Sequence, residues 1–365
     1  MKTQKTFSTG LKYFFCFLLI LFISSQLLSA ATIIRADDPN IDYTGRIDFS
    51  DPQSPVLYWP GTNITAGFEG TSVKIVLEDP GGDNYYNVII DNDSQNPVTI
   101  DCEKGRREYP ITTGLKDTVH TIRIFRRTEG FSGPTVFKGF VLDNDKILTA
   151  PPPAAKHKIE FFGDSITCGM GNECPDDGPD EDNAKRNNYL AYGAITARNL
   201  YAEYVCTAKN GIGIIISWFD MIMPDYYDRL NPAEPDSKWD FSRWTPDAVV
   251  INLFQNDSWL INRLDPVPGP EQIADAYYNF IKTIRKTYPD ASIICALGSM
   301  DATKAGSPWP GYIKTAVNKF KKENNDNKIH YYFFKYDGTG KHPRVRHHQQ
   351  IAKELTAFIR STLNW

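Results

Sequence analysis

Four segments in the second half of the chain place chemically versatile residues directly after an apolar, strand-like run. The runs are KIEFF, AEYVCTA, DAVVINLF and IHYYFF. The residues that follow them are, in chain order, Gly163–Ser165, Lys209–Gly213, Gln255–Asp257 and the segment from Asp337 to His342. A hydroxyl, glycine amides, a carboxamide and an imidazole therefore recur at equivalent positions after successive strands. Together these groups are sufficient for acyl transfer.

The chemistry that this set predicts is attack by the hydroxyl of Ser165 on an ester carbonyl. A serine hydroxyl is a weak nucleophile until a base takes its proton, and His342 is the candidate base because imidazole titrates near neutral pH. The oxyanion of the tetrahedral intermediate needs fixed hydrogen-bond donors, and the backbone amides of Ser165 and Gly211 and the side chain of Asn256 are the candidates. Gly213 is an alternative to Gly211, since either glycine supplies an amide.

A parallel sheet with its helices is the element that would bring these residues together. Five apolar runs alternate with segments of helical pattern, which is typical of a parallel sheet covered on both faces. One such segment repeats apolar residues at helical spacing, namely Ile273, Tyr277, Phe280, Ile281 and Ile284. Ligands of open parallel sheets bind outside the carboxyl ends of the strands, so the four strand ends share one rim. We expect a three-layer α/β domain with a five-stranded parallel sheet over residues 156–365.

The first half of the chain has a different pattern. The short segments SVKIVL, NVIID, HTIRIF and TVFKGFVL are rich in β-branched and aromatic residues and are separated by turn signals such as DPGGDN. Short strands separated by turn-forming residues predict an all-β sandwich over residues 32–150. PPPAA at residues 151–155 has three consecutive prolines, which hold the chain extended, and it predicts a linker between the halves.

The N-terminus has the order of a signal peptide, which we place at residues 1–31. Lysines precede the uncharged run Tyr13–Ile23, and a stretch of small and polar residues follows it. The run is shorter than the roughly 20 residues that a membrane-spanning helix needs, although an uncleaved anchor is the competing interpretation. Cleavage near Ala30 or Ala31 would leave a secreted or periplasmic protein with no stable membrane insertion.

Charge and cysteine content limit the function further. The net charge is -4 without a strongly basic domain, so a nucleic-acid partner is not expected. No residue spacing indicates a zinc site, and we expect neither a metal nor another cofactor. Five cysteines remain after signal cleavage, and the odd number leaves at least one thiol unpaired. Cys168 and Cys174 flank a glycine-rich loop and could form a disulfide, or the cysteines fill space in the core.

The four strand ends resemble a known superfamily. GDS at Ser165, a glycine after the second strand, Asn-Asp after the third and His-Pro near the C-terminus resemble the SGNH (GDSL-type) hydrolases. IEFFGDSITCGMGNE, WDFSRWTPDAVVINL, YWPGTNITAGFEGTSVKIVL and NYYNVIIDN together resemble carbohydrate esterase family 2. This resemblance covers nearly the whole chain after the signal peptide. It implies a jelly-roll β-sandwich ahead of an SGNH hydrolase domain in a secreted deacetylase.

The resemblance also implies roles for individual residues. Ser165 would be the nucleophile, His342 the general base and then the general acid, and Gly211 and Asn256 oxyanion donors alongside the Ser165 amide. The third member of the triad departs from the family pattern. An Asp usually stands three residues before the His, whereas Asp337 stands five before. Either Asp337 completes the triad or a backbone carbonyl orients the imidazole.

Two aromatic residues near the third strand end are also informative. Phe254 stands where the family usually has a glycine, which affects the expected shape of the pocket wall. Trp259 follows the Asn-Asp pair and is a candidate for stacking on a sugar ring, with core packing as the alternative.

The function that follows is a secreted carbohydrate O-deacetylase that acts on acetylated xylan or mannan-type polysaccharides or their oligosaccharides. A serine acyl-enzyme would carry the acetyl group. A lipolytic GDSL esterase would use the same residues and is the first alternative. The second is an inactive glycan-binding protein, motivated by Phe254 and by the unusual spacing of Asp337.

Overall fold

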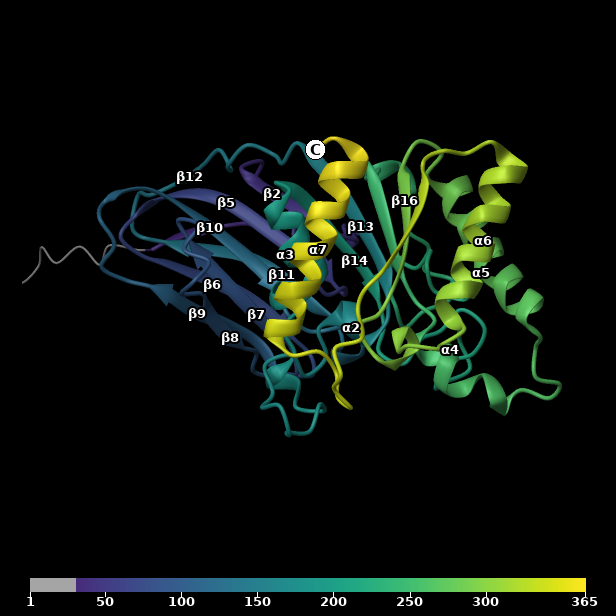
Figure 1. Ribbon diagram of the computed structural model, residues 1–365. Coiled ribbons are helices and arrows are strands. Elements are labelled where there is room, and N and C mark those ends of the chain that lie inside the picture. The colour runs from purple at the N-terminus through teal and green to yellow at the C-terminus, as the bar shows by residue number, and fades with distance from the viewer. Residues whose placement is uncertain (1–30) are drawn as a thin grey trace, which may run out of the picture.

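The computed structural model describes residues 31–365. The predicted signal peptide therefore lies, except for its last residue, outside the described residues. An antiparallel β half and an α/β half lie side by side, with the C-terminal helix on the outer surface of the second half (Figure 1). Both predicted architectures are confirmed. Within this range no helix has the length and apolarity that a bilayer span requires.

The first half is a sandwich of two antiparallel six-stranded sheets. One sheet has the order β3 (Ile47–Asp48), β4 (Val56–Leu57), β11 (Thr135–Leu142), β6 (Val73–Asp79) and β9 (Gly105–Thr112), with β1 (Thr32–Ile34) also paired to β11. The other has the order β12 (Leu148–Thr149), β5 (Asn63–Gly70), β10 (Thr118–Arg126), β7 (Tyr85–Ile90) and β8 (Val98–Asp101), with β2 (Ile41–Thr44) also paired to β5. Alternate residues of the facing strands, such as Phe68 and Leu77, bury their side chains in a shared core.

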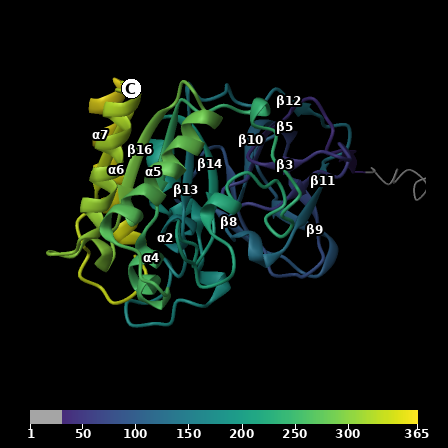
Figure 2. The same ribbon diagram turned by 90° about the vertical axis from the view of Figure 1, so that its right-hand side faces the viewer.

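The second half is built on a parallel sheet of five strands. Its order is β14 (Ala202–Ala208), β13 (His157–Gly163), β15 (Ala248–Asn252), β16 (Ser292–Leu297) and β17 (Ile329–Phe333). The helices α3 (Tyr192–Asn199) and α7 (Val345–Leu363) pack on one face, and α5 (Pro270–Thr287) and α6 (Trp309–Asn324) on the other (Figures 1 and 2). The first strand, β13, lies between the second and third, where the strand order reverses. Ligands of such sheets bind at this switch point.

The register aligns the three strand ends that meet at the switch point. Gly163, the last residue of β13, pairs with Ala208 of β14 and with Asn252 of β15. The segments that follow these strands therefore leave the sheet at the same level. This alignment places the loop after each strand around the start of α2 (Ser165–Cys168).

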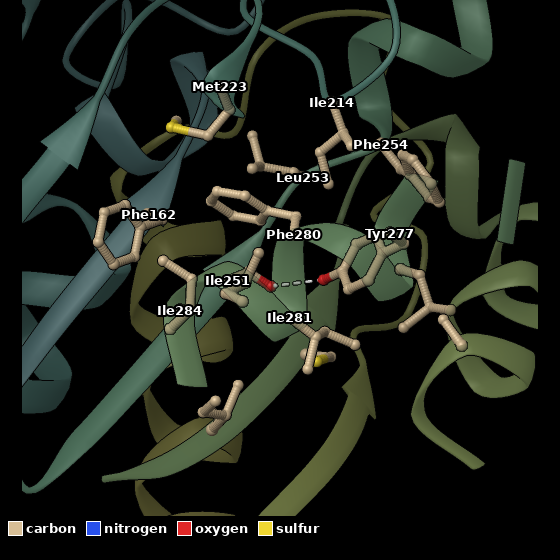
Figure 3. Packing of buried hydrophobic residues seen from close by; sticks show 14 of the residues in the cluster. Phe162, Ile214, Met223, Ile251, Leu253, Phe254, Tyr277, Phe280, Ile281 and Ile284 are labelled. Carbon is tan, nitrogen blue, oxygen red and sulfur yellow. Dashed lines mark hydrogen bonds between the residues drawn. The ribbon is translucent and has the colours of Figure 1, made fainter. Parts of the chain in front are cut away.

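A core of apolar side chains between the sheet and α5 holds these strands in place (Figure 3). The side chains from the helix are those predicted at helical spacing, Ile273, Tyr277, Phe280, Ile281 and Ile284, and all are buried. They pack against strand residues such as Phe162 and Ile251, and the Tyr277 hydroxyl donates a hydrogen bond of 3.2 Å to the carbonyl of Ile251. Each buried side chain of this size contributes about 1.5–3 kcal/mol, so the helix is held mainly by this face.

A buried ion pair joins the two halves. Arg46 of the sandwich lies 2.8 Å from Glu160 of β13, and both side chains are 1% exposed. Arg46 also donates to two backbone carbonyls of the second half, while Glu160 accepts from the hydroxyls of Thr207 and Tyr288. Breaking one side of a buried pair typically costs about 3–5 kcal/mol because the other charge remains buried. The sandwich and the sheet therefore form one packed unit.

The cysteines fill space in this unit. Cys102, Cys168, Cys174, Cys206 and Cys295 are buried free thiols. The Cys168–Cys174 disulfide is therefore not formed in the structure.

Candidate active site

Ser165 lies at the turn between β13 and the short helix α2. Asp164 caps this helix, and its side chain accepts a hydrogen bond of 3.0 Å from the Ile166 amide. The turn is tight at Gly163, where a Cβ atom would lie 2.0 Å from the hydroxyl of Thr167. Ser165 therefore occupies the first helical position, and its own amide is free of acceptors among the described residues.

His342 joins Ser165 to a carboxylate. Its Nε2 atom lies 2.8 Å from the Ser165 hydroxyl, and its Nδ1 atom lies 2.9 Å from the carboxylate of Asp180. An ionised carboxylate can only accept, so Nδ1 donates to Asp180 and Nε2 accepts from Ser165. This is the geometry of a serine nucleophile, its base and an orienting acid.

The acid that contacts His342 is Asp180, so the prediction of Asp337 in this position is wrong. Asp337 turns toward its own loop, where it accepts hydrogen bonds of 2.9 Å from the amide and hydroxyl of Thr339 and one of 3.0 Å from Ser299. The five-residue spacing explains why Asp337 does not reach His342. The residues between Asp337 and His342 form a turn around the carboxylate of Asp337, which keeps it away from the imidazole.

Arg344 fixes Asp180 from the side opposite His342. One oxygen of Asp180 accepts a hydrogen bond of 2.5 Å from Arg344, and the other accepts from both Nδ1 and the backbone amide of His342. Arg344 also donates to the carbonyls of Gly171 and Pro175, so it holds the whole loop after α2 against the start of α7.

These contacts determine the charge of Asp180. Burial acts to raise its pKa, but the hydrogen bonds from His342 and Arg344 outweigh burial and hold the pKa well below the ordinary value of 3.8. Asp180 is therefore ionised at neutral pH. The stability that its bonds confer is present above the ordinary pKa and is lost as the pH falls through the lowered value.

Gly211 and Gly213 differ in whether their amides are free. The amide of Gly213 donates a hydrogen bond of 3.0 Å to the Ser217 hydroxyl, whereas that of Gly211 has no acceptor within residues 31–365. Gly211 has a φ of 82°, and a Cβ atom there would lie 3.3 Å from Trp218. Backbone conformation and space thus both favour glycine at position 211, and the geometry favours Gly211 as the available donor.

Asn256 lies at the start of α4 (Gln255–Leu260), beside the same loop. Its Nδ2 atom donates to the carbonyl of Ile212 at 2.9 Å and lies 3.4 Å from Asp164, while its carbonyl oxygen accepts from the Trp218 indole at 3.1 Å. Burial raises the pKa of Asp164 to about 7, although the bond from Ile166 opposes this shift. The bonds to Ile212 and Trp218 hold Asn256 in one orientation, whereas its contact with Asp164 is long.

Asp257 fixes the loop after β14. Its carboxylate accepts hydrogen bonds from the consecutive amides of Ile214, Ile215 and Ile216. Burial raises the pKa of Asp257 to about 6 against the effect of these donors. Asp257 therefore organises the loop through these three backbone donors.

The sandwich also contacts the loop that carries Gly211. Glu129 follows β10, is 2% exposed and accepts a hydrogen bond of 2.8 Å from the amide of Asn210. Its other oxygen pairs with Arg186 at 2.7 Å. A charged group of the first half therefore positions the residue next to the free amide of Gly211.

Two tryptophans lie on the exposed side of this region. Trp259 is 40% exposed, and its indole donates to the carboxylate of Asp301 at 2.9 Å. Trp218 is 54% exposed, bonds to Asn256 and has the guanidinium of Arg263 over its ring at 4.6 Å. Trp259 is therefore not a core residue, and Trp218 has a direct connection to the site.

Phe254 does not form an exposed wall. It is buried and packs against Tyr277, whose ring centroid lies 4.8 Å away (Figure 3). The ring of Trp309 lies 5.0 Å away. Its φ of 92° lies in the region that favours glycine, and a bulky residue there is a genuine outlier. The aromatic packing holds this backbone conformation directly before α4.

Three residues of this site were not predicted from the sequence. Asp180 lies in the acidic loop CPDDGPDED, in which no spacing distinguishes it from its neighbours. Glu129 belongs to the other half of the chain, and only the packing of the halves brings it near Gly211. Trp218 could have been proposed as a site residue, because the pair Ser217-Trp218 closely follows the glycines of the second strand end.

Comparison with family models assigns each half of the chain separately. Residues 43–152 match the model described as carbohydrate esterase 2 N-terminal. Residues 161–347 match the GDSL-like lipase/acylhydrolase family.

Known relatives match across most of the chain. The cellulase/esterase CelE of Acetivibrio thermocellus is 35% identical over 90% of this chain and 40% of its own length, so the chain spans about two fifths of that protein. A protein of Cellvibrio japonicus named acetylxylan esterase / glucomannan deacetylase is 30% identical over 74% of this chain and 77% of its own. The solved structure of a family two carbohydrate esterase from Clostridium thermocellum in complex with cellohexaose is 32% identical, with a TM-score of 0.80, over 89% of this chain and 99% of its own.

The position of Asp180 can be tested with a matched pair of variants. Asp180→Asn should lower kcat for a small acetyl ester on the order of 10³-fold or more, because the imidazole loses the acceptor that fixes its orientation. Asp337→Asn should lower kcat by less than about tenfold, since it alters only a neighbouring turn. An equal loss of kcat in the two variants, with folding verified by circular dichroism, would contradict the assignment of Asp180 as the acid that orients His342.

The contact from the sandwich can be tested through Glu129. Glu129→Gln should lower kcat about tenfold with little change in KM. Removing an oxyanion donor altogether lowers kcat about 10²–10³-fold, and this change only weakens the contact that positions the amide of Gly211. Glu173→Gln is the control, since Glu173 pairs with Arg127 across the same interface without touching Asn210. Parent-like kcat in Glu129→Gln would show that the contact is only structural.

Proposed function

This chain belongs to carbohydrate esterase family 2, and we propose that it is a serine esterase that removes acetyl groups from polysaccharides or oligosaccharides. The observation that carries the proposal is the continuous series of hydrogen bonds from Ser165 through His342 to Asp180. It lies at the switch point of the sheet, next to the free amides of Ser165 and Gly211.

The reaction follows from this geometry. Ser165 attacks the acetyl carbonyl while Nε2 of His342 takes its proton, and Asp180 stabilises the imidazolium without itself becoming protonated. The amides of Ser165 and Gly211 would bind the developing oxyanion. Asn256 would join them through the N–H that otherwise makes the long, 3.4 Å contact with Asp164, while its other N–H stays on the carbonyl of Ile212. His342 then gives the proton to the sugar oxygen as its bond to the acetyl carbon breaks, so that the sugar leaves as an alcohol and the acetyl group stays on Ser165. A water molecule activated by His342 releases acetate and restores the serine.

The substrate side of the proposal rests on the exposed aromatic residues and on the relatives. Trp218 and Trp259 are partly exposed on the segments that follow β14 and β15, with Arg263 over one face of Trp218, and aromatic rings suit the apolar faces of sugar rings. A relative is named acetylxylan esterase / glucomannan deacetylase, and a related structure contains cellohexaose. We propose acetylated xylan or glucomannan, or oligosaccharides of these, as the substrate class.

The division of the chain and its location belong to the same proposal. Residues 1–31 would be removed as a signal peptide, residues 32–150 would form the sandwich domain, residues 151–155 the linker and residues 156–365 the hydrolase domain. A secreted or periplasmic location would give the enzyme access to polysaccharide.

The proposal is tested by acetate release from acetylated xylan, acetylated glucomannan and 4-nitrophenyl acetate. The parent should release acetate from at least one polysaccharide, and Ser165→Ala should lower the rate on the order of 10⁴-fold or more, because the nucleophile is lost. Long-chain 4-nitrophenyl esters serve as the comparison. A preference for long-chain esters would favour a lipolytic esterase, and glycan binding without any release would favour an inactive binding protein.

A further inference from the structure

A second cavity lies between the two halves, away from Ser165. Its volume is about 100 Å³, enough for several water molecules or one small oxyanion. The outer face of β2, β5 and β10 forms one wall, α3 and the start of β14 form another, and the proline linker closes one side. Asp42, Pro153 and Ala154 on its border are exposed, so solutes can reach it.

Two guanidinium groups line this cavity without a carboxylate bound to either. Arg123 comes from β10 and Arg198 from α3, and neither forms an ion pair or a side-chain hydrogen bond within the described part of the chain. Burial lowers the pKa of Arg198, and the like charge of Arg123 lowers it further, while the neighbouring Tyr189 acts to raise it. Two cations that share a partly enclosed site without an anion destabilise each other.

Several buried polar atoms at the cavity also lack partners. These atoms are Nε of Arg123, Nη1 of Arg198, the hydroxyl of Tyr204 and Oδ1 of Asn63. Three of the four can donate hydrogen bonds, and buried polar groups are ordinarily paired. The guanidinium of Arg198 is held in place by the ring of Tyr189, whose centroid lies 3.8 Å away. The cavity is thus pre-formed and rich in donors.

The acidic residues at the cavity do not neutralise these arginines. Glu203 accepts a hydrogen bond of 2.6 Å from the indole of Trp244 and lies 3.9 Å from Lys158. Asp42 and Arg123 both pair with Thr65 of β5, from its two sides, so the strand separates their backbones. Asp42 is also exposed at the mouth, where water screens its charge.

We propose that this cavity is a binding site for a small oxyanion, held by Arg123 and Arg198 between the sandwich and the hydrolase domain. Inorganic phosphate, sulfate and a short carboxylate such as acetate share the required chemistry, because each presents oxygen acceptors to guanidinium donors. An anion in this position contacts both halves at once. Its binding therefore stabilises their packing.

Thermal unfolding at constant ionic strength tests the site, with chloride replaced stepwise by phosphate, sulfate or acetate in separate series. The Tm of the parent should rise with the logarithm of the concentration of at least one oxyanion above its Kd, as binding to the folded state alone requires. Arg198→Met and Arg123→Met should each weaken the apparent affinity about tenfold or more. Arg106→Met is the control, because Arg106 is exposed on β9 and does not line the cavity.

The variants also separate binding from a structural role. In chloride alone, Arg198→Met should be at least as stable as the parent, because it removes one of two unneutralised cations. A rise of Tm that is linear in oxyanion concentration and equal in the parent, both cavity variants and the control would be a general salt effect and would overturn the proposal. An unchanged oxyanion response in both cavity variants would overturn it as well. If one variant does not fold, the other still decides between these outcomes.

Discussion

The candidate site depends on the carboxylate of Asp180, which lies between His342 and Arg344. One oxygen orients the imidazole toward Ser165, and the other binds the guanidinium that holds the loop after α2 against α7. The same contact keeps Asp180 ionised, because two cationic or donor groups oppose the effect of burial. The loop, the helix and the histidine are therefore positioned by a single side chain.

The sandwich half is part of this arrangement. Arg46 pairs with Glu160 of β13, and Glu129 bonds to the loop that carries Gly211. Both are nearly inaccessible to water, where a charge is stable only with fixed partners. The interface is thus determined by specific buried charges in addition to apolar packing. The sandwich consequently supports the loop that carries Gly211 directly.

The sequence predicted most of the fold and much of the site because both follow local patterns. Ser165, Gly211, Asn256 and His342 follow strands, and the parallel register brings strand ends together. Asp180 could not be predicted, since a long acidic loop offers several equivalent carboxylates and only the tertiary path selects one. The prediction of Asp337 was wrong for a different reason. The spacing between Asp337 and His342 was compatible with a triad, but the loop folds around the carboxylate of Asp337. Phe254 takes a conformation suited to glycine because Tyr277 and Trp309 pack against it, which no local rule indicates.

Proton NMR of the far-downfield region tests the central claim most directly, because a proton shared between imidazole Nδ1 and a carboxylate is strongly deshielded. Because Nδ1 of His120 also contacts a carboxylate, that of Asp91 at 2.7 Å, the resonance of His342 is identified as the one lost in His342→Ala. We expect the same resonance to be lost in Asp180→Ala but retained in Asp337→Ala. Its retention in Asp180→Ala together with its loss in Asp337→Ala would contradict the claim that Asp180 orients His342.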